Sequence, residues 1–273
     1  MSRMSGGGSD GSRRRAAERA RLTKLVRASL VVVAAALVSD AVGGRLSNGS
    51  PASDASAASA DTSTASTTTT APPVTLAPLP SIPGEAPVIS RVETTDPVVF
   101  LTIDDGHTRT PEVLAAFDSL GVPATLFLLD GPVQAGADFF RAMPNTAVEG
   151  HTRNHPDLRT LSEQAQQAEI CGNADTIERT FGRRPVLFRP PYGAYNDATK
   201  RAAAACGVTA VVMWEESVNG QVVSYASVPQ LRPGDIVLMH FRPTFVEELR
   251  TISQQVEQAG LRFALLEDYL GVG

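Results

Sequence analysis

From residue 98 onward, hydrophobic and polar positions follow two different periods along the chain. Short apolar runs, typical of buried strands, alternate with longer segments that have the spacing of amphipathic helices. The predicted strands cover residues 98–103, 124–129, 186–188, 208–213, 236–239 and 263–266. The predicted helices cover residues 111–120, 162–181, 196–205 and 246–259.

This order of elements predicts an α/β fold with a mainly parallel, barrel-like sheet, because each helix can carry the chain back to start the next parallel strand. The first helix also has clear ends. Thr110 is a candidate cap, Pro111 stands at the first helical position and Gly121 follows the last one.

The N-terminal segment has the pattern of an export signal. Residues 1–39 hold eight basic and two acidic side chains, a net charge of +6, and residues 28–38 form an apolar run. This run is shorter than the roughly 20 residues of a spanning helix, although residues 22–42 taken together could form a marginal anchor. We expect residues 1–45 to be a signal peptide or membrane anchor and the protein to be extracytoplasmic, either secreted or anchored.

Between this segment and the first predicted strand, Ser, Thr, Ala and Pro dominate the composition. Such a segment buries too little apolar surface to offset the entropy of ordering it. We expect residues 46–85 to be a disordered linker and residues 86–273 to form the folded domain.

Charge and cysteine content narrow the function classes. The chain carries −5 overall, so the part beyond residue 39 carries −11, which argues against binding to a phosphate backbone. The two cysteines, Cys171 and Cys206, can pair in an oxidising compartment or remain as buried thiols. The sequence leaves both alternatives open.

Two aspartates, Asp104 and Asp105, end the first predicted strand, and Gly106 follows them. Carboxylates at the end of a buried strand are costly unless a cation compensates them, and a bound metal would do so. Successive strand residues point to opposite sides, so one aspartate could bind metal while the other transfers protons. The alternative is a plain Asp-Gly surface turn.

Three histidines add to this chemistry. His151 and His155 are four residues apart, and one helical turn would place both on one face, as in many metal-binding pairs; otherwise they are solvent-exposed side chains. His240 follows the strand at 236–239 and could protonate a leaving amine, or could be a hydrogen-bonded core histidine.

Arg189 directly follows the strand at 186–188, and a Pro-Pro turn comes after it. Its guanidinium could hold a carboxylate through two hydrogen bonds. The alternative is an ordinary surface arginine in a turn.

Taken in order, four segments resemble the NodB-type polysaccharide deacetylases, carbohydrate esterase family four. They are Thr-Ile-Asp-Asp-Gly at 102–106, His-Thr-Arg-Asn-His at 151–155, Arg-Pro-Pro-Tyr-Gly at 189–193 and Leu-Met-His at 238–240. The resemblance spans about residues 98–270. It implies a distorted (β/α)7-type barrel and one divalent metal ion, zinc first, with cobalt, nickel or manganese as alternatives.

The resemblance also assigns roles to individual residues. It implies Asp104 as general base, Arg189 as its tether, Asp105, His151 and His155 as metal ligands, His240 as general acid and the backbone N–H of Tyr192 as an oxyanion donor. The family has an acidic residue that supports the catalytic histidine, and here Glu215 or Glu216 could take that role. Trp214 beside them is either a core residue or a sugar platform.

The function implied by the resemblance is removal of N-acetyl groups from an N-acetylglucosamine-containing polysaccharide, peptidoglycan or a chitin-like glycan. One alternative is an O-acetyl esterase acting on a polysaccharide such as acetylxylan, and another is a catalytically weak carbohydrate-binding protein of the envelope. The expected partners are the carbohydrate polymer and the cell envelope, with no nucleic acid, and the expected state is a monomer.

Overall fold

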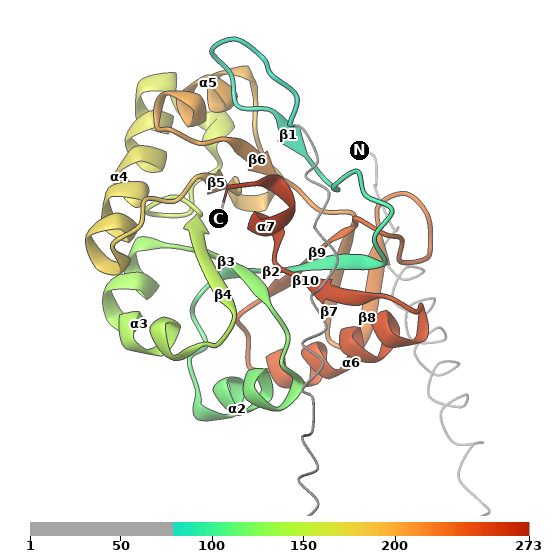
Figure 1. Ribbon diagram of the computed structural model, residues 1–273. Helices are drawn as coiled ribbons and strands as arrows, with labels where there is room; N and C mark the ends of the chain where they lie inside the picture. The colour runs from blue at the N-terminus through green and yellow to red at the C-terminus, as the bar shows by residue number, and fades with distance from the viewer. Residues whose placement is uncertain (1–78, 273) are drawn as a thin grey trace, which may run out of the picture. The chain divides into compact units, whose positions relative to one another are not determined.

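A curled, mainly parallel sheet runs through residues 79–272, which are the residues that this computed structural model describes (Figure 1). Its strands are β1 (Val88–Ile89), β2 (Val98–Asp105), β3 (Ala124–Leu128), β4 (Thr146–Gly150), β5 (Leu187–Phe188), β6 (Ala210–Val212), β7 (Glu216–Asn219), β8 (Val222–Tyr225), β9 (Ile236–His240) and β10 (Arg262–Ala264).

The strands follow the order β1-β6-β5-β4-β3-β2-β9-β7-β8, and β10 pairs with the first half of β2. All described pairings within the sheet are parallel except that of β7 with β8. The curled sheet is not closed, because β1, β8 and β10 each pair with only one other strand. An open, curled sheet of mainly parallel strands joined by helices is a distorted α/β barrel, so the fold that the sequence predicted is confirmed.

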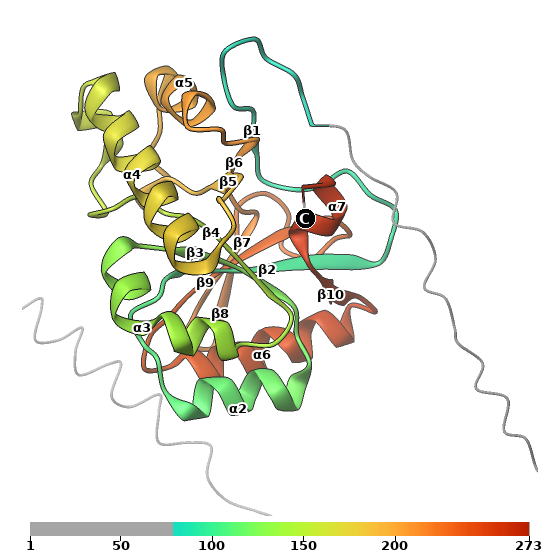
Figure 2. The ribbon, with the colours of Figure 1, turned by 60° about the vertical axis from the view of Figure 1, so that its left-hand side comes forward.

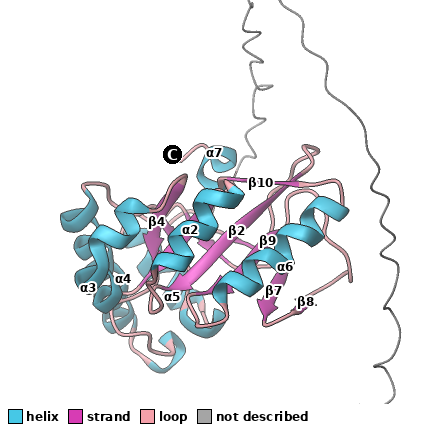
Figure 3. Cartoon of the chain, turned by 90° about the horizontal axis from the view of Figure 1, so that it is seen from below, coloured by secondary structure: helices cyan, strands magenta, loops and turns pink. Residues whose placement is uncertain are grey.

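Helices cover the outside of this sheet. They are α2 (Pro111–Leu120), α3 (Asp130–Ala142), α4 (Glu163–Phe181), α5 (Asp197–Ala205) and α6 (Phe245–Gln258). The short helix α7 (Leu266–Leu270) instead packs against the apolar cluster inside the curled sheet. Neighbouring helices pack in pairs, α2 with α6, α3 with α4 and α4 with α5 (Figure 2). Seen from below, α2 and α6 lie on either side of β2 and run along it (Figure 3).

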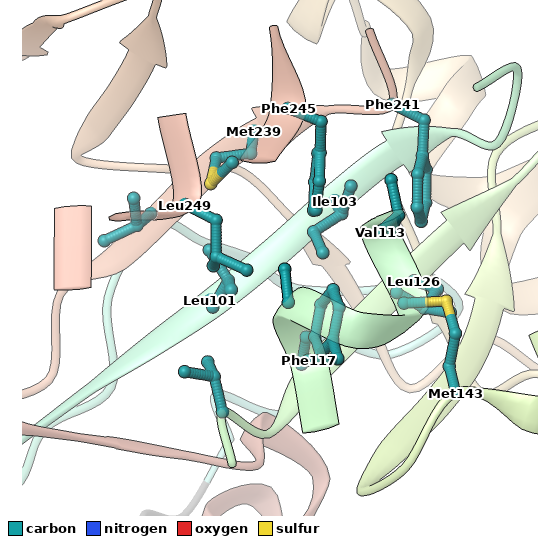
Figure 4. Packing of buried hydrophobic residues seen from close by; sticks show 14 of the residues in the cluster. Leu101, Ile103, Val113, Phe117, Leu126, Met143, Met239, Phe241, Phe245 and Leu249 are labelled. Carbon is teal, nitrogen blue, oxygen red and sulfur yellow. The ribbon is translucent and has the colours of Figure 1, made fainter. Parts of the chain in front are cut away.

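The residues of β2 alternate between two apolar layers, because successive strand side chains point to opposite faces. Val99, Leu101 and Ile103 pack against α2 and α6, with Phe117 and Phe245 among the rings that they meet (Figure 4). On the other face of β2, the interior of the curled sheet holds a second cluster that includes Val98 and Phe100. Thr102 and Asp104 continue this inward face, so the alternation carries Asp104 into the interior.

Residues expected to begin and end helices are found at those positions in the structure. Pro111 begins α2, and Gly121 ends it in a left-handed conformation with φ 61°. Thr110 is the N-cap residue, although its side chain makes no capping hydrogen bond to the helix backbone. Ser162 caps α4 by accepting the backbone N–H of Ala165. The expected helix at 162–181 therefore begins one residue later, at Glu163.

Cys171 on α4 and Cys206 at the end of α5 form a disulfide, with Cα atoms 5.0 Å apart. Of the two alternatives that the sequence left open, the pair is the one that the structure shows. The bond joins two helices that already pack against each other.

Several elements were missed by the sequence analysis: strands β1, β7 and β8, and, between residues 129 and 162, where it expected only a helical turn at 151–155, helix α3 and strand β4. Helix α3 contains two glycines and a proline, and Gly136 has a non-helical φ of −143°, so its periodicity is broken. Strand β4 contains one β-branched apolar residue and ends in glycine, a weak strand signal. The expected strand at 263–266 ends at Ala264, and Leu266 already begins α7.

Much of the N-terminal prediction lies outside the described residues, including the apolar run at 28–38 and residues 46–78 of the expected linker. Residues 79–85 are described: Ile82 and Glu85 form a β-bridge, and Leu79 packs against the interior cluster. No helix within residues 79–272 is long and apolar enough to cross a membrane.

Candidate active site

The predicted site residues lie at one rim of the sheet, where the parallel strands end. Asp104 and Asp105 end β2, His151 follows β4, Arg189 follows β5 and His240 ends β9. The carboxyl ends of parallel strands share one edge, which is where α/β barrels gather their functional groups. The register places Asp104 directly beside His240 on the neighbouring strand. The fold thus brings together residues that are up to 136 positions apart in the sequence.

Arg189 and Asp104 form a buried ion pair inside the curled sheet. The Arg189 Nη1 donates to Asp104 Oδ1 at 2.7 Å and to Thr102 Oγ1 at 2.8 Å. Arg189 is 0% exposed and Asp104 is 3% exposed. Charges this deeply buried are tolerated only when they are paired and hydrogen-bonded, so the two side chains depend on each other.

The rest of the Arg189 guanidinium is also fixed. Its Nε and Nη2 donate to the backbone oxygens of Val212 and Met213, at 3.1 and 3.2 Å. Its central carbon lies 4.3 Å from the centre of the Phe127 ring and 5.6 Å from that of Trp214. Burial lowers the pKa of Arg189, and the Asp104 charge opposes that shift. Arg189 is therefore a rigid cationic support and not the surface arginine of the alternative interpretation.

Asp105, His151 and His155 form the candidate metal centre. One potential ligand atom from each lies within 4.8 Å of the other two. Both imidazole Nε2 atoms are 3.6 Å from Asp105 Oδ1. Asp105 reaches this position because it leaves β2 with a φ of 75°, and Gly106 follows with a φ of 89°. A Cβ on Gly106 would come within 3.0 Å of Phe140, so this turn requires glycine on two counts.

The segment from His151 to His155 is not the helical turn that the sequence analysis expected. Thr152 and His155 have φ values of 71° and 58°, which a right-handed helix does not contain. Thr152 Oγ1 accepts the His155 backbone N–H at 3.1 Å, and Glu169 on α4 accepts two further backbone N–H groups of the loop at 2.9 and 3.1 Å. The rings of His151 and His155 are therefore brought together by a loop whose backbone N–H groups are hydrogen-bonded to side chains. Helical periodicity plays no part in it.

The His151 ring is held in one orientation by its Nδ1, which lies 2.7 Å from the backbone oxygen of Arg189. A carbonyl oxygen can only accept, so Nδ1 carries the proton and the lone pair of Nε2 is free. This Nε2 is the atom that faces Asp105, and a backbone carbonyl on the other ring nitrogen is a common feature of metal-binding histidines.

Neighbouring charges shift the pKa values at this centre. Burial alone would raise the pKa of Asp105, but the His151 ring and the charges of His240 and His155 outweigh it, so that the pKa is lowered. Burial and the nearby His151 lower the pKa of His155, against the opposing effect of Asp105. Both shifts favour the carboxylate and neutral imidazole that bind divalent metals.

His240 lies at the end of β9, and its Nδ1 is 2.8 Å from Nη2 of Arg242. The adjacent backbone is tied to the site, because the Phe241 N–H donates to the backbone oxygen of Asp104 at 3.2 Å. Burial lowers the pKa of His240; Asp104 opposes this shift and Arg242 adds to it. The ring is thus favoured in its neutral form.

Neither glutamate suggested as a support for His240 takes that place. Glu215 accepts hydrogen bonds from Ser90, Ser227 and Arg232. Glu216 lies buried beside Asp235, before the start of β9, and burial together with this neighbouring carboxylate raises its pKa to about 9. Both side chains turn toward the amino end of β9, and among residues 79–272 no hydrogen bond joins either one to His240. The sequence left this support undecided, because register, which local sequence does not reveal, decides which strand residues face the rim.

Tyr192 and Trp214 flank the site. Tyr192 is 71% exposed, and its ring packs edge-on against His155 with ring centres 4.5 Å apart. Its φ of 61° turns the chain sharply after the two prolines. Trp214 lies beneath this turn, where a Cβ on Gly193 would come within 2.8 Å of its ring. Of its two suggested uses, Trp214 serves here as packing for the Arg189 loop.

Three supporting residues carry no assignment from the sequence. Thr102 was part of the first quoted segment, and its position two before Asp104 on one strand face was a usable signal. Asn173 on α4 accepts the His151 backbone N–H at 2.9 Å. Arg242 contacts His240. Nothing in the local sequence distinguishes Asn173 or Arg242 from ordinary polar positions.

Comparisons with known proteins agree with this geometry. The polysaccharide deacetylase family model matches residues 91–211. The chain is 40% identical over 194 residues to an uncharacterised protein of Streptomyces coelicolor, covering 67% of this chain and 77% of that protein. It is 30% identical over 152 residues to a chitooligosaccharide deacetylase of Rhizobium leguminosarum bv. trifolii, covering 52% and 70%. It is 28% identical over 194 residues to a peptidoglycan-N-acetylglucosamine deacetylase of Bacillus cereus, covering 66% and 91%.

Two solved structures share the fold. A family 4 carbohydrate esterase from Streptomyces lividans, in complex with acetate, is 26% identical with a TM-score of 0.56, covering 65% of this chain and 97% of that one. A pseudoenzyme of the same family from Bacillus anthracis is 24% identical with a TM-score of 0.59, covering 69% and 70%, and this likeness shows the fold alone. On the family model, the relatives and the shared fold, the chain belongs to the polysaccharide deacetylase family, carbohydrate esterase family 4.

Proposed function

We propose that the protein is a metal-dependent hydrolase that removes N-acetyl groups from an N-acetylglucosamine-containing polysaccharide of the cell envelope. The observation that carries this proposal is the cluster of Asp105, His151 and His155 beside the buried pair of Asp104 and Arg189. Relatives named for peptidoglycan and chitooligosaccharide deacetylation support the substrate class. Peptidoglycan and a chitin-like glycan both carry this acetamido group. We place peptidoglycan first, because an exported or anchored bacterial enzyme meets it first.

The donor set of Asp105, His151 and His155 fits a divalent metal. One carboxylate and two imidazole nitrogens make three protein ligands, the number that leaves a coordination position open in catalytic zinc sites. Imidazole also binds cobalt and nickel, and carboxylate suits manganese, so zinc is our first choice among these metals. A metal held there would acidify a water molecule and polarise the acyl oxygen.

The surrounding residues divide the proton chemistry of amide hydrolysis. Asp104 accepts a proton from the attacking water, and Arg189 holds the Asp104 carboxylate in place and stabilises its negative charge. The backbone N–H of Tyr192 donates to the oxyanion. The neutral ring of His240 donates a hydrogen bond to the departing nitrogen, and Asp104 passes to that nitrogen the proton that it took from the water. The products are acetate and a free amine on the sugar.

The substrate assignment is tested by acetate release from three polymers: peptidoglycan fragments, acetylated chitooligosaccharides and acetylxylan. We expect release from the first two in the presence of zinc, loss of release after chelation and its return when zinc is added. Release from acetylxylan alone would identify an O-acetyl esterase. No metal-dependent release from any polymer would reject the enzyme proposal and favour a carbohydrate-binding protein of the envelope.

The roles of individual residues are tested by two variants compared for activity and metal content. We expect Asp104→Asn to lose turnover and keep its metal, because Asp104 is outside the ligand cluster, and His155→Ala to lose the metal itself. His107→Ala is the matched control, since His107 is an exposed histidine of the adjacent loop and should keep both. Equal metal loss in the Asp104 and His155 variants would contradict this division of roles.

We also propose that the protein acts outside the cytoplasm. The disulfide between Cys171 and Cys206 supports this location, because such bonds persist mainly in oxidising compartments. Fractionation of cells that produce the full chain, with and without residues 1–45, tests the proposal. Recovery of both forms from the cytoplasm alone would refute it.

A further inference from the structure

The contact between Arg242 and His240 determines which ring nitrogen of His240 carries a proton. Arg242 Nη2 lies 2.8 Å from His240 Nδ1. An arginine side chain has only donors, so Nδ1 must be the acceptor. The single proton of the neutral ring is then on Nε2, the nitrogen at the other side of the ring.

Arg242 is itself held from a second side. Its Nη1 donates to the side-chain oxygen of Asn219 at 2.9 Å, and Asn219 is the last residue of β7, which pairs with β9. The preceding residue, Phe241, is buried and stacks on Phe245 of α6 with ring centres 5.3 Å apart. One guanidinium therefore spans two neighbouring strand ends, from a backbone position fixed by the core.

This arrangement differs in kind from a carboxylate beside a histidine. A carboxylate accepts a hydrogen bond from Nδ1–H. The single proton of a neutral ring is then on Nδ1, so Nε2 has none and can only accept a hydrogen bond. With arginine as the partner, the neutral ring already offers Nε2–H. A neutral imidazole does not give up this proton, so the ring donates a hydrogen bond to the departing nitrogen, and the proton that the nitrogen receives is the one that Asp104 took from the water.

We propose that Arg242 is a positioning residue that fixes the ring of His240 so that Nε2–H is offered to the departing group beside Asp104. The inference rests on the proposed function for the identity of that group. The Nδ1 contact and the tautomer stand on the geometry alone.

The tautomer is measured by long-range ¹H–¹⁵N spectra of the zinc-loaded protein, with the His240 signals identified by their loss in His240→Gln. We expect an unprotonated Nδ1 and a protonated Nε2 in the wild type. In Arg242→Met, which keeps the length of the side chain and removes its donors, we expect the ring to sample both tautomers. A proton on Nδ1 in the wild type would overturn the inference.

Kinetics test the consequence. We expect Arg242→Met to lower kcat about ten- to a hundredfold, the usual effect of losing a hydrogen bond to a charged group, with a much smaller change in KM and no loss of zinc. Arg242→Lys, which keeps the cation and a donor, should recover part of kcat. Arg250→Met, at an exposed arginine on α6, is the matched control and should leave kcat unchanged.

These measurements separate failure of the inference from failure of the proposed function. If the wild type releases no acetate, the proposed function fails, whereas the spectra still decide how His240 is held. If Arg242→Met changes neither the tautomer nor kcat, Arg242 is no positioning residue. Equal losses of kcat in the Arg242 and Arg250 variants would also reject the inference, because they would point to a general charge effect.

Discussion

Removing the guanidinium of Arg189 should destabilise the whole domain, apart from any effect on catalysis. Arg189→Met keeps most of the side-chain volume but leaves the Asp104 carboxylate, which is 3% exposed, without its cation. The same change leaves the backbone oxygens of Val212 and Met213 without their donors. Breaking a buried ion pair by deleting one partner costs about 3–5 kcal/mol. We expect a loss in this range in the free energy of unfolding.

A double-mutant cycle isolates the part due to the pair. Asp104→Asn alone should also destabilise, because it leaves the Arg189 cation buried without a countercharge, and the double variant should be less destabilised than the sum of the two. Urea unfolding of metal-free protein measures these values, followed by circular dichroism and by the fluorescence of Trp214, the only tryptophan. Metal must be absent, because it would add its own stabilisation.

The control is Arg184→Met, which removes ion pairs to Asp175 and Glu178 at the surface. Exposed pairs of this kind contribute at most about 1 kcal/mol. Additive losses from the Asp104 and Arg189 variants, within about 0.5 kcal/mol, would refute the argument that the two buried charges depend on each other. So would a loss for Arg189→Met no larger than that of the control.

Three further predictions follow from single contacts. Replacing Cys171 and Cys206 by serine should lower the free energy of unfolding by about 4 kcal/mol, the loop-entropy value for a sequence separation of 35, and urea unfolding without reductant checks it. Burial, with the charge of Glu149 adding to it, raises the pKa of Glu267 to about 7 from 4.5, so the wild type should lose stability as pH rises through this range. Above pH 7, Glu267→Gln should therefore be more stable than the wild type by up to about 3 kcal/mol. Unfolding curves of both proteins at pH 5 and pH 8 measure this difference. Asn173→Ala removes the acceptor of the His151 backbone N–H, so the affinity for zinc should fall about ten- to a hundredfold. Competition with a chelator measures this affinity, and an unchanged value would contradict the role of Asn173 in positioning His151.

The elements with the strongest local signals were predictable. Strand β2 has an unbroken apolar run, and helix α2 has a proline at its start and a glycine at its end, so both were predicted to within a few residues. The strand ends carrying Asp104, Arg189 and His240 were predictable for the same reason. Helix α3 and strand β4 were not, because their glycines, proline and polar residues weaken local preferences, and packing in the folded domain stabilises them.

The loop from His151 to His155 shows the limit of periodicity as an argument. A spacing of four residues fits a helical turn, yet the left-handed conformations of Thr152 and His155 exclude one. The loop is stabilised by Glu169 and Asn173, two side chains of α4 that lie well beyond it in the sequence. A prediction from the segment alone could find the two ligands and not their conformation.

The sequence by itself determined the family, the alternation of strands and helices, and the strand ends that carry Asp104, Arg189 and His240, because these depend on local patterns and on short motifs. The resemblance already paired Arg189 with Asp104, whereas only the tertiary structure decided the other partners: the Arg189 carbonyl for His151, and Arg242 in place of an acid for His240. The physical reason is that strand register and loop closure bring together groups far apart in the chain. The proton on each imidazole is then set by which group stands beside it.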